Sequence, residues 1–395
     1  MPVPFVFAAP NHTLDKWSHD QNKFIAFQLF VNILQELPLA SYCQQKLYNH
    51  CLAYADNTSD CDSALNEVTT HTDQFVDWLV NGSFLSAILN SLLQQQILTN
   101  LLDIQQVIVA VNQRLSQLPS SMSSLVVYRA QLIRAHDLEH IKANTGELIA
   151  FHTFLLATEN LETAREIGRQ AANRGLLAVI FEIDVPVKTR IAKVDECRFI
   201  FRFGNIFRLQ SIHLAPDGVW YAQLRCADSI FQSVQEQLQI QVGERLTWLT
   251  LGNYLCALNN VKEAKSYYEH LLQILPKDHE ALASIYNNMG LLFTELGEKQ
   301  EALKYYNLAL GSIKNTSPNA DQCLHLTRFK ALPPPAVVEL TVSCSDVYEQ
   351  IAETYRRQSK PEQALEFYRK ALEQTIDPVS RVQYEQKIQE TLSLI

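Results

Sequence analysis

The chain has 395 residues, of which 47% are hydrophobic and 19% are charged, a balance typical of soluble globular proteins. Its length predicts about two or three domains. The net charge of -9 excludes nucleic acid as the main partner, because phosphate binding requires a basic face. No run of about 18 apolar residues occurs, so we expect no membrane-spanning helix and no membrane partner.

Eight cysteines are scattered along the chain, and none of them forms a C-x-x-C pair. This distribution favours reduced thiols in a cytoplasmic protein. A disulfide within the stretch Cys43–Cys61 is the alternative that a secretory protein would favour. The stretch Met1–Pro10 lacks basic residues and is interrupted by prolines, so it is not expected to act as a signal peptide.

Residues from about 20 to 118 are expected to be helical. Leu85, Leu89 and Leu92 recur at helical spacing, with polar residues between them. Pro119 ends this pattern, and a serine-rich stretch follows it.

The next part of the chain alternates between strand-like and helix-like patterns. Leu176–Val185 is a continuous apolar run, typical of a buried strand. Further strands are expected at 125–128, 151–156, 197–203, 206–214 and 219–224, with one helix ending near 142 and another at 161–174. Residues 121–228 therefore predict an α+β domain.

Familiar catalytic and metal-binding motifs are missing from this domain. It has no glycine-rich phosphate loop, no H-E-x-x-H and no G-x-S-x-G. His136 and His140 lie four residues apart on the expected helix, with Glu139 beside them. Two ligands do not make a zinc site, so no bound metal is expected.

After Asp228 the sequence predicts a linker at 229–244 and then helices to the end. A loop at 317–344 interrupts them, because Pro333, Pro334 and Pro335 cannot continue a helix. Three windows in this region, beginning at Arg245, Ala283 and Ser345, carry small and aromatic residues at matching positions. The matching residues are Trp248, Leu251, Gly252, Ala264, Tyr268 and Pro276, then Tyr286, Met289, Gly290, Phe293, Ala302, Tyr306 and Ala309, then Tyr348, Ile351, Ala352, Tyr355, Ala364, Tyr368 and Ala371.

These windows resemble the tetratricopeptide repeat, at 245–278, 283–316 and 345–378, with a capping helix at 379–395. Glycine or alanine permits close helix approach, and aromatic rings fill the space between the helices. Because one helix pair cannot bury its apolar face alone, the repeats must stack. We expect an all-α solenoid that binds a protein or peptide in its groove; a generic helical bundle is the alternative.

Some arrays of this kind clamp a C-terminal carboxylate with Lys, Asn and Arg side chains. Asn253 and Asn288 stand at two matching positions of such a clamp. However, the positions that require cations hold Leu249, Asp346 and Gln350. Because a carboxylate is held best by charged donors, we expect no carboxylate clamp.

Four segments of the middle domain suggest a family: Val127–Gln131, Gly146–Thr158, Leu177–Val185 and Asp195–Leu209. In order and spacing they resemble the arginine-specific mono-ADP-ribosyltransferase family, above all members with tetratricopeptide repeats behind the catalytic domain. The resemblance covers about 120–213 and, more loosely, the helices from 75 to 118. It implies an ADP-ribosyltransferase-like α+β core at 121–228, with residues 1–120 as its helical N-terminal part.

The resemblance also implies an NAD-dependent glycosyl transfer to protein arginine. In the family an arginine holds the NAD phosphates, a Ser-Thr-Ser strand orders the site, and a Glu-x-Glu motif supplies two carboxylates that suit a cationic sugar. Arg129 matches the phosphate-binding arginine, and Thr158 is the hydroxyl that remains of Ser-Thr-Ser. Glu196 matches the first carboxylate, whereas Arg198 replaces the second, catalytic one.

The substitution at position 198 decides the expectation for activity. A carboxylate about 4 Å from a developing positive charge contributes about 4 kcal/mol at an effective dielectric constant of about 20. Arg198 reverses the sign of this interaction, so activity should be impaired by orders of magnitude. We therefore expect a protein that acts mainly through protein interaction.

Alternatives to this interpretation remain open. An active transferase would result if a strand slip of two residues brought Glu196 into the catalytic position. The alternative for Arg198 is a solvated residue at the end of the strand, paired with Glu196. The alternative for Arg129 is a purely structural role. Binding of NAD is therefore undecided at this point.

Overall fold

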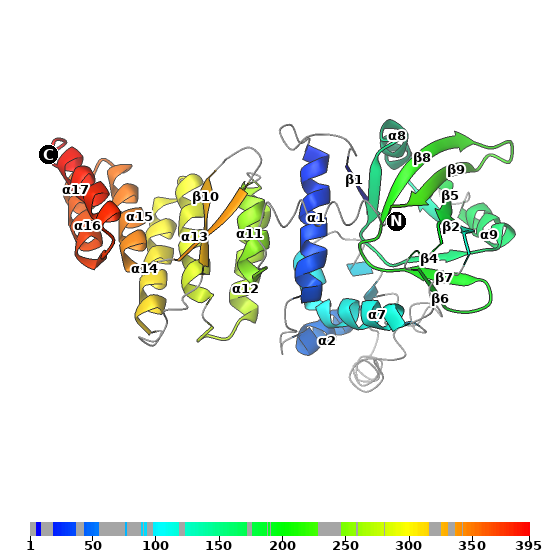
Figure 1. Cartoon of the computed structure of the whole chain (residues 1–395), viewed down its shortest axis with the longest axis horizontal. Coiled ribbons are helices and arrows are strands. Elements are labelled where there is room, and N and C mark those ends of the chain that lie inside the picture. The colour runs from blue at the N-terminus through cyan, green and yellow to red at the C-terminus, as the bar shows by residue number, and fades with distance from the viewer. Residues whose placement is uncertain are drawn as a thin grey trace. The chain divides into compact units, whose positions relative to one another are not determined.

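The computed structural model describes residues 5–8, 19–36, 43–54, 76, 88–89, 91–92, 98–117, 123–171, 176–187, 189, 191–227, 246–257, 260–279, 281–315, 325–330, 336–341 and 343–395. The chain divides into two compact units, residues 1–240 and 241–395 (Figure 1). The predicted linker at 229–244 and the cysteine at position 61 lie outside the described residues.

The first unit is built on a mixed β-sheet. In the described part of this unit the strand order is β1-β3-β8-β9-β5-β2-β4-β7-β6. β5 and β9 pair in parallel, and the other neighbours pair antiparallel. The strands are β1 (Phe5–Ala8), β2 (Leu125–Ile133), β3 (Leu148–Phe151), β4 (Leu155–Thr158), β5 (Leu177–Val185), β6 (Ile191–Lys193), β7 (Arg198–Phe201), β8 (Ile206–Leu214) and β9 (Trp220–Cys226).

Helices pack on both faces of this sheet. Ile141 of one helix belongs to the same buried cluster as Val127 and Phe181. On the other face, Ala164 of a second helix packs with Ile180. The described helices of the unit are α1 (His19–Glu36), α2 (Cys43–Tyr54), α6 (Leu98–Asp103), α7 (Gln105–Gln117), α8 (Ala135–Ala143) and α9 (Leu161–Ala171). Of these, α8 contributes Ile141 and α9 contributes Ala164.

Helix α1 approaches the sheet closely at the turn between β7 and β8. Gly204 in this turn has a φ of +85°, and a Cβ atom there would lie 2.8 Å from a methyl carbon of Val31. The side chain of Gln28 donates a hydrogen bond to the carbonyl oxygen of Gly204 over 3.2 Å. Only glycine meets both the conformational and the steric requirement of this contact.

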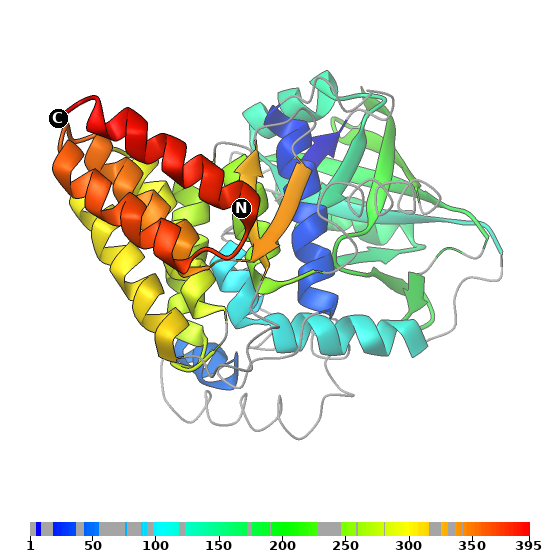
Figure 2. The ribbon, with the colours of Figure 1, turned by 60° about the vertical axis from the view of Figure 1, so that its left-hand side comes forward.

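The second unit stacks helices in sequence order (Figures 1 and 2). Gly252 faces the ring of Tyr268 on the next helix, and Ala352 packs with Tyr368 in the same way. A Cβ atom at Gly252 would lie 2.5 Å from two carbons of that ring, so glycine permits the close helix contact. The helices are α11 (Trp248–Ala257), α12 (Val261–Ile274), α13 (Leu282–Glu295), α14 (Lys299–Asn315), α15 (Cys344–Arg356), α16 (Pro361–Gln374) and α17 (Pro378–Leu392).

The predicted fold class is confirmed in outline: an α+β domain precedes a helical region of stacked helix pairs, which also contains one β-hairpin. Strands β1 and β6 were not predicted. Because β1 lies at Phe5–Ala8, the N-terminal part is not purely helical. The strand expected at 151–156 is two strands, β3 and β4, separated by residues 152–154. Among the described residues, no helix combines the length and apolar character needed to cross a membrane.

The expectation of a loop at 317–344 was wrong at thirteen of its residues, of which twelve lie in two strands and Cys344 begins α15. Strands β10 (His325–Lys330) and β11 (Ala336–Thr341), of 6 residues each, form an antiparallel hairpin there. The three prolines exclude a continuous helix, but they do not exclude strands on either side of them. Ala336–Thr341 is rich in β-branched residues, which favour strands.

Candidate functional site

A row of polar side chains crosses the sheet of the first unit. Tyr128 of β2 pairs with Thr158 of β4, which in turn pairs with Arg198 of β7. Tyr128 also pairs with Glu182 of β5 on its other side. Directly opposed residues of antiparallel strands lie on the same face, so these four residues form one row.

Arg198 is held in an ion pair at the start of β7. Its guanidinium Nε contacts the Oδ2 atom of Asp195. The other oxygen of that carboxylate accepts hydrogen bonds from the backbone N–H groups of Arg198, at 2.8 Å, and Cys197, at 3.1 Å. Burial opposes ionisation of Asp195, but these hydrogen bonds outweigh it and lower its pKa.

Glu196 does not pair with Arg198 as the structural alternative had it. Glu196 is exposed, in the bend that precedes β7. The acidic partner of Arg198 is instead Asp195. The first strand residue is Arg198, opposite Thr158, so Glu196 lies two residues outside the strand.

Arg129 lies on the opposite face from this row. Neighbouring residues of a strand point to opposite faces, and Arg129 follows Tyr128 and shares the face of Val127, which is fully buried in the core. Its guanidinium donates to the carbonyl oxygen of Leu156 over 2.9 Å and to Gln131 over 3.2 Å. Burial lowers the pKa of Arg129 to about 10, so the group remains charged at neutral pH.

The sheet therefore brings together only part of the set that the sequence singled out. Thr158 and Arg198 are neighbours, whereas Arg129 is on the other face and Glu196 is exposed beside them. The Thr158 hydroxyl accepts a hydrogen bond from the backbone N–H of Asn160 over 3.1 Å, a local role at the end of β4. Across the described residues, no group of three or more potential metal ligands gathers.

Tyr128 and Glu182 were not singled out from the sequence, although they belong to the same row. Burial raises the pKa of Tyr128, and the charge of Glu182 adds to this effect. The signal was available: Glu182 is an acidic residue inside the apolar run Leu177–Val185. A carboxylate at such a position requires a polar neighbour or solvent.

A second polar group lies between the first two repeats. The Asn253 side-chain oxygen accepts hydrogen bonds from the Tyr268 hydroxyl and, over 2.7 Å, from the Asn288 amide. All three side chains are 0–1% exposed. The two asparagines of the predicted groove therefore bind each other and a core tyrosine, and they link one repeat to the next.

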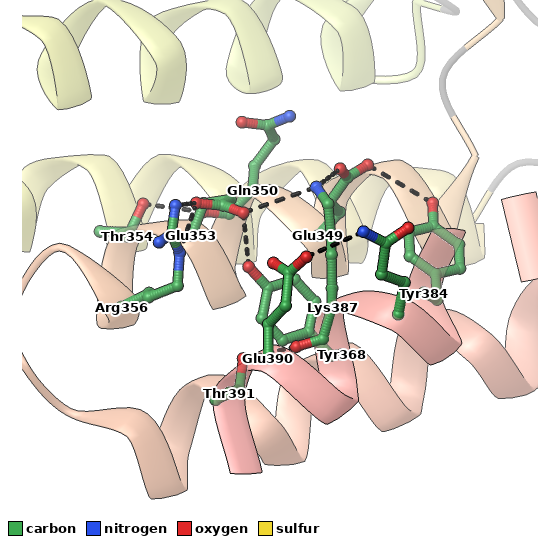
Figure 3. Close-up of polar contacts among 11 residues, drawn as sticks. Glu349, Gln350, Glu353, Thr354, Arg356, Tyr368, Tyr384, Lys387, Glu390 and Thr391 are labelled. Carbon is green, nitrogen blue, oxygen red and sulfur yellow. Dashed lines mark hydrogen bonds and ion pairs between the residues drawn. The ribbon is translucent and has the colours of Figure 1, made fainter. Parts of the chain in front are cut away.

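A third group, at the C-terminal end, is acidic. Lys387 of α17 pairs with Glu349 and, over 3.5 Å, with Glu353, both on α15 (Figure 3). The Tyr368 hydroxyl also donates to Glu353. Burial would raise the pKa of Glu353, but the hydrogen bonds from Tyr368 and Arg356 and the charge of Lys387 lower it overall.

These carboxylates bear on the predicted absence of a carboxylate clamp. Gln350 and Asp346 occupy two positions where a clamp needs a cation. The Gln350 side chain points away from Glu349 and Glu353, which pair with Lys387 (Figure 3). At Asp346 an incoming carboxylate would meet like charge. This third repeat is better suited to a cationic or neutral segment.

Comparisons with known proteins identify the repeats. Tetratricopeptide repeat models match residues 244–314 and 347–381. No curated protein matches the chain.

Solved structures of low similarity include several ADP-ribosyltransferases. The chain is similar to an ADP-ribosyltransferase from Clostridium botulinum, with 10% identity and a TM-score of 0.31 over 40% of this chain and 88% of that chain. It is similar to Vis toxin, an ADP-ribosyltransferase from Vibrio splendidus, with 16% identity and a TM-score of 0.27 over 55% and 89%. It is also similar to BtubC (BKLC) from P. vanneervenii, with 16% identity and a TM-score of 0.30 over 42% and 65%.

Likeness at this level says nothing about activity or cofactor. The chain thus carries tetratricopeptide repeats at 244–314 and 347–381 and is similar to solved ADP-ribosyltransferases.

Proposed function

We propose that this chain acts by holding a protein or extended peptide in its tetratricopeptide-repeat groove, and that its transferase-like domain does not transfer ADP-ribose. In this proposal residues 1–228 are the transferase-like domain, 229–244 the linker, 245–378 the repeats and 379–395 the cap. The scattered cysteines favour the reducing cytoplasm as its compartment.

The pair between Arg198 and Asp195 is the observation that carries the proposal. A cationic sugar intermediate needs a carboxylate beside it, and the matching position holds a guanidinium instead. The carboxylate of Asp195 is already engaged by that guanidinium and by two backbone amides. Loss of about 4 kcal/mol of transition-state stabilisation corresponds to about three orders of magnitude in rate.

The position of Arg129 supports the same conclusion. An NAD pyrophosphate held by Arg129 would lie on the core face of β2, away from Thr158 and Arg198. Its two hydrogen bonds, to the Leu156 carbonyl and to Gln131, support a structural role for Arg129, while its buried Nε has no partner among the described residues. We therefore propose that NAD is not bound productively.

Transfer of labelled ADP-ribose to a small guanidine acceptor and to a mixture of proteins tests the proposal. The full chain should transfer no more label than the matched Glu196→Ala variant, because neither contains a working carboxylate pair. Transfer by the wild-type chain that the Glu196→Ala substitution abolishes would establish the enzyme instead.

A further inference from the structure

Helix α1 meets the sheet of the first unit through a group of aromatic rings. The centroid of the Phe27 ring on α1 lies 4.0 Å from that of the His152 imidazole and 5.5 Å from that of the Phe203 ring. The Phe154 ring packs against Phe203 with 5.8 Å between the centroids. Helix α1 also lies beside β1, the strand that pairs with β3 (Figure 1). The residues that join β3 to β4, 152–154, therefore contribute two of the rings at the junction with α1.

Polar side chains at this junction are only partly satisfied. Gln28 of α1 donates one hydrogen bond to the carbonyl oxygen of Gly204, and Asn112 of α7 accepts one from the backbone N–H of Phe203 over 3.2 Å. The second polar atom of each amide, Oε1 of Gln28 and Nδ2 of Asn112, is buried without a hydrogen bond among the described residues, and so is Nε2 of His152. Each such atom is less stable than a bonded one. The junction is therefore weaker than its buried rings alone would make it.

The imidazole of His152 is poorly placed to carry a charge. The residue is 7% exposed, and burial lowers its pKa to about 3, so the ring is neutral at neutral pH. A protonated ring would be a buried charge with no acceptor at Nε2. The face of the Phe27 ring offers only a modest attraction, which does not replace the solvation that burial removes. Protonation therefore favours a state in which the imidazole reaches water.

Charged residues on the neighbouring elements do not offset this cost. Among the side chains that the structure describes, Lys23 lies one turn before the aromatic contact on α1 and is exposed. Arg202 donates to a serine of α7. Glu147 and Arg208 lie beside the opposite end of β3. Burial is the cause of the lowered pKa of His152, so its charge gains no support from these groups.

We propose that protonation of His152 separates α1 from the sheet, so that the helix is held at neutral pH and released in mild acid. Release frees the imidazole from Phe27 and breaks the hydrogen bond from Gln28 to Gly204. It also exposes Phe24, Phe27 and Phe30 of α1, which are at most 2% exposed while the helix is in place. The inference involves neither NAD nor the repeat groove.

The direction of the pH dependence follows from the two pKa values of His152. In the released state the imidazole has its ordinary pKa of about 6.5, whereas in the closed state the pKa is about 3. The released state therefore binds more protons below about pH 6.5. The closed state has its full stability above that pH and loses it as pH falls toward the lower pKa. Between about pH 7.5 and about pH 5, the equilibrium constant for release should rise about 30-fold.

Hydrogen exchange of the α1 amides in the full chain tests the inference. Protection factors are compared at about pH 7.5 and about pH 5, after correction for the intrinsic exchange rate at each pH. In the wild type, protection of α1 should fall about 30-fold. His152→Phe keeps a ring against Phe27 and cannot titrate, so protection should change far less. The matched control is His136→Gln on α8, where the histidine side chain is 72% exposed, and it should respond like the wild type.

A second variant, His152→Gln, replaces the imidazole with a smaller neutral side chain and should also lose the pH response. Protection of wild-type α1 that is the same at both pH values overturns the inference, whatever the variants do. An equal loss of protection in the wild type, His152→Phe and His152→Gln overturns it as well, because the pH dependence would then belong to other groups.

Discussion

Polar residues are used differently in the two units of this chain. In the sheet, the arginines that the sequence grouped together are on opposite faces, Arg129 toward the core and Arg198 toward Thr158. In the repeats, residues from successive helix pairs converge, as Asn253 and Asn288 do on Tyr268. Strand parity separates neighbours, whereas stacked repeats bring equivalent positions together. Residue identity alone is thus a better guide to contacts in the repeats than in the sheet.

The helices of the first repeat approach each other most closely at Gly252. A substitution of this glycine is expected to give the largest change in stability. Gly252→Ala places a Cβ atom 2.5 Å from the Tyr268 ring, whose hydroxyl is fixed by hydrogen bonds to the two asparagines. We expect a loss of about 2 kcal/mol from overpacking, measured by urea unfolding. The control is Gly311→Ala, where no described atom would lie within 4 Å of the new Cβ, and it should gain about 1 kcal/mol. Equal effects at both glycines would contradict the packing argument.

The capping helix is expected to depend on one lysine. Lys387→Met removes the partner of Glu349 and Glu353, and loss of one member of a partly buried pair should cost about 2 kcal/mol of unfolding free energy. Lys304→Met, which breaks an exposed pair with Glu301, is the control and should cost under about 0.5 kcal/mol. Equal unfolding free energies of the two variants would show that the capping helix α17 does not depend on the pairs of Lys387 with Glu349 and Glu353.

The same cluster predicts a pH dependence. The pKa of Glu353 is lowered in the folded state, so its contribution is fully present above the unfolded-state pKa of about 4.3 and is lost as pH falls through the folded-state value. Unfolding free energy should therefore decrease below about pH 5, and less steeply in Lys387→Met than in the wild type. An identical slope in the two proteins would count against the ion pair.

In the sheet unit, the pair at position 198 should matter little for stability. Both side chains of the pair are 36% exposed, and such pairs contribute about 1 kcal/mol or less. Asp195→Asn should therefore change the unfolding free energy by no more than about 1 kcal/mol, and the exposed Glu196→Gln should change it by about zero. A larger loss of unfolding free energy would mean that Asp195 stabilises the fold in addition to holding Arg198.

No effect at all is expected from a C-terminal carboxylate on binding. The clamp positions carry no cation, and Asp346 at one of them is acidic. A chaperone-type tail peptide should bind no better with a free carboxylate than with an amidated end. Micromolar binding that amidation abolishes would refute this prediction.

Much of the fold follows from local patterns. The run Leu177–Val185 is strand β5, and small and aromatic residues at repeat spacing mark the helix pairs, as Gly252 and Tyr268 illustrate. The pairing of Thr158 with Arg198 could not be predicted, since the register between β4 and β7 is set by contacts between distant residues. Arg129 lies two residues after Val127, so the two share a face if both lie in one strand. The sequence predicted a strand only at 125–128, whereas β2 continues to Ile133, so the face of Arg129 could not be assigned from the sequence.

Hydrolysis of NAD in the absence of any acceptor tests the central claim most directly, because it requires no knowledge of a target. The wild-type chain and the Arg198→Glu variant are compared at the same NAD concentration. We predict that neither exceeds the buffer background, since Arg198 opposes the cationic sugar in one and Arg129 remains on the wrong face in both. Turnover by the wild type would contradict the loss of activity, and turnover by Arg198→Glu alone would contradict the assignment of Arg129 to a structural role.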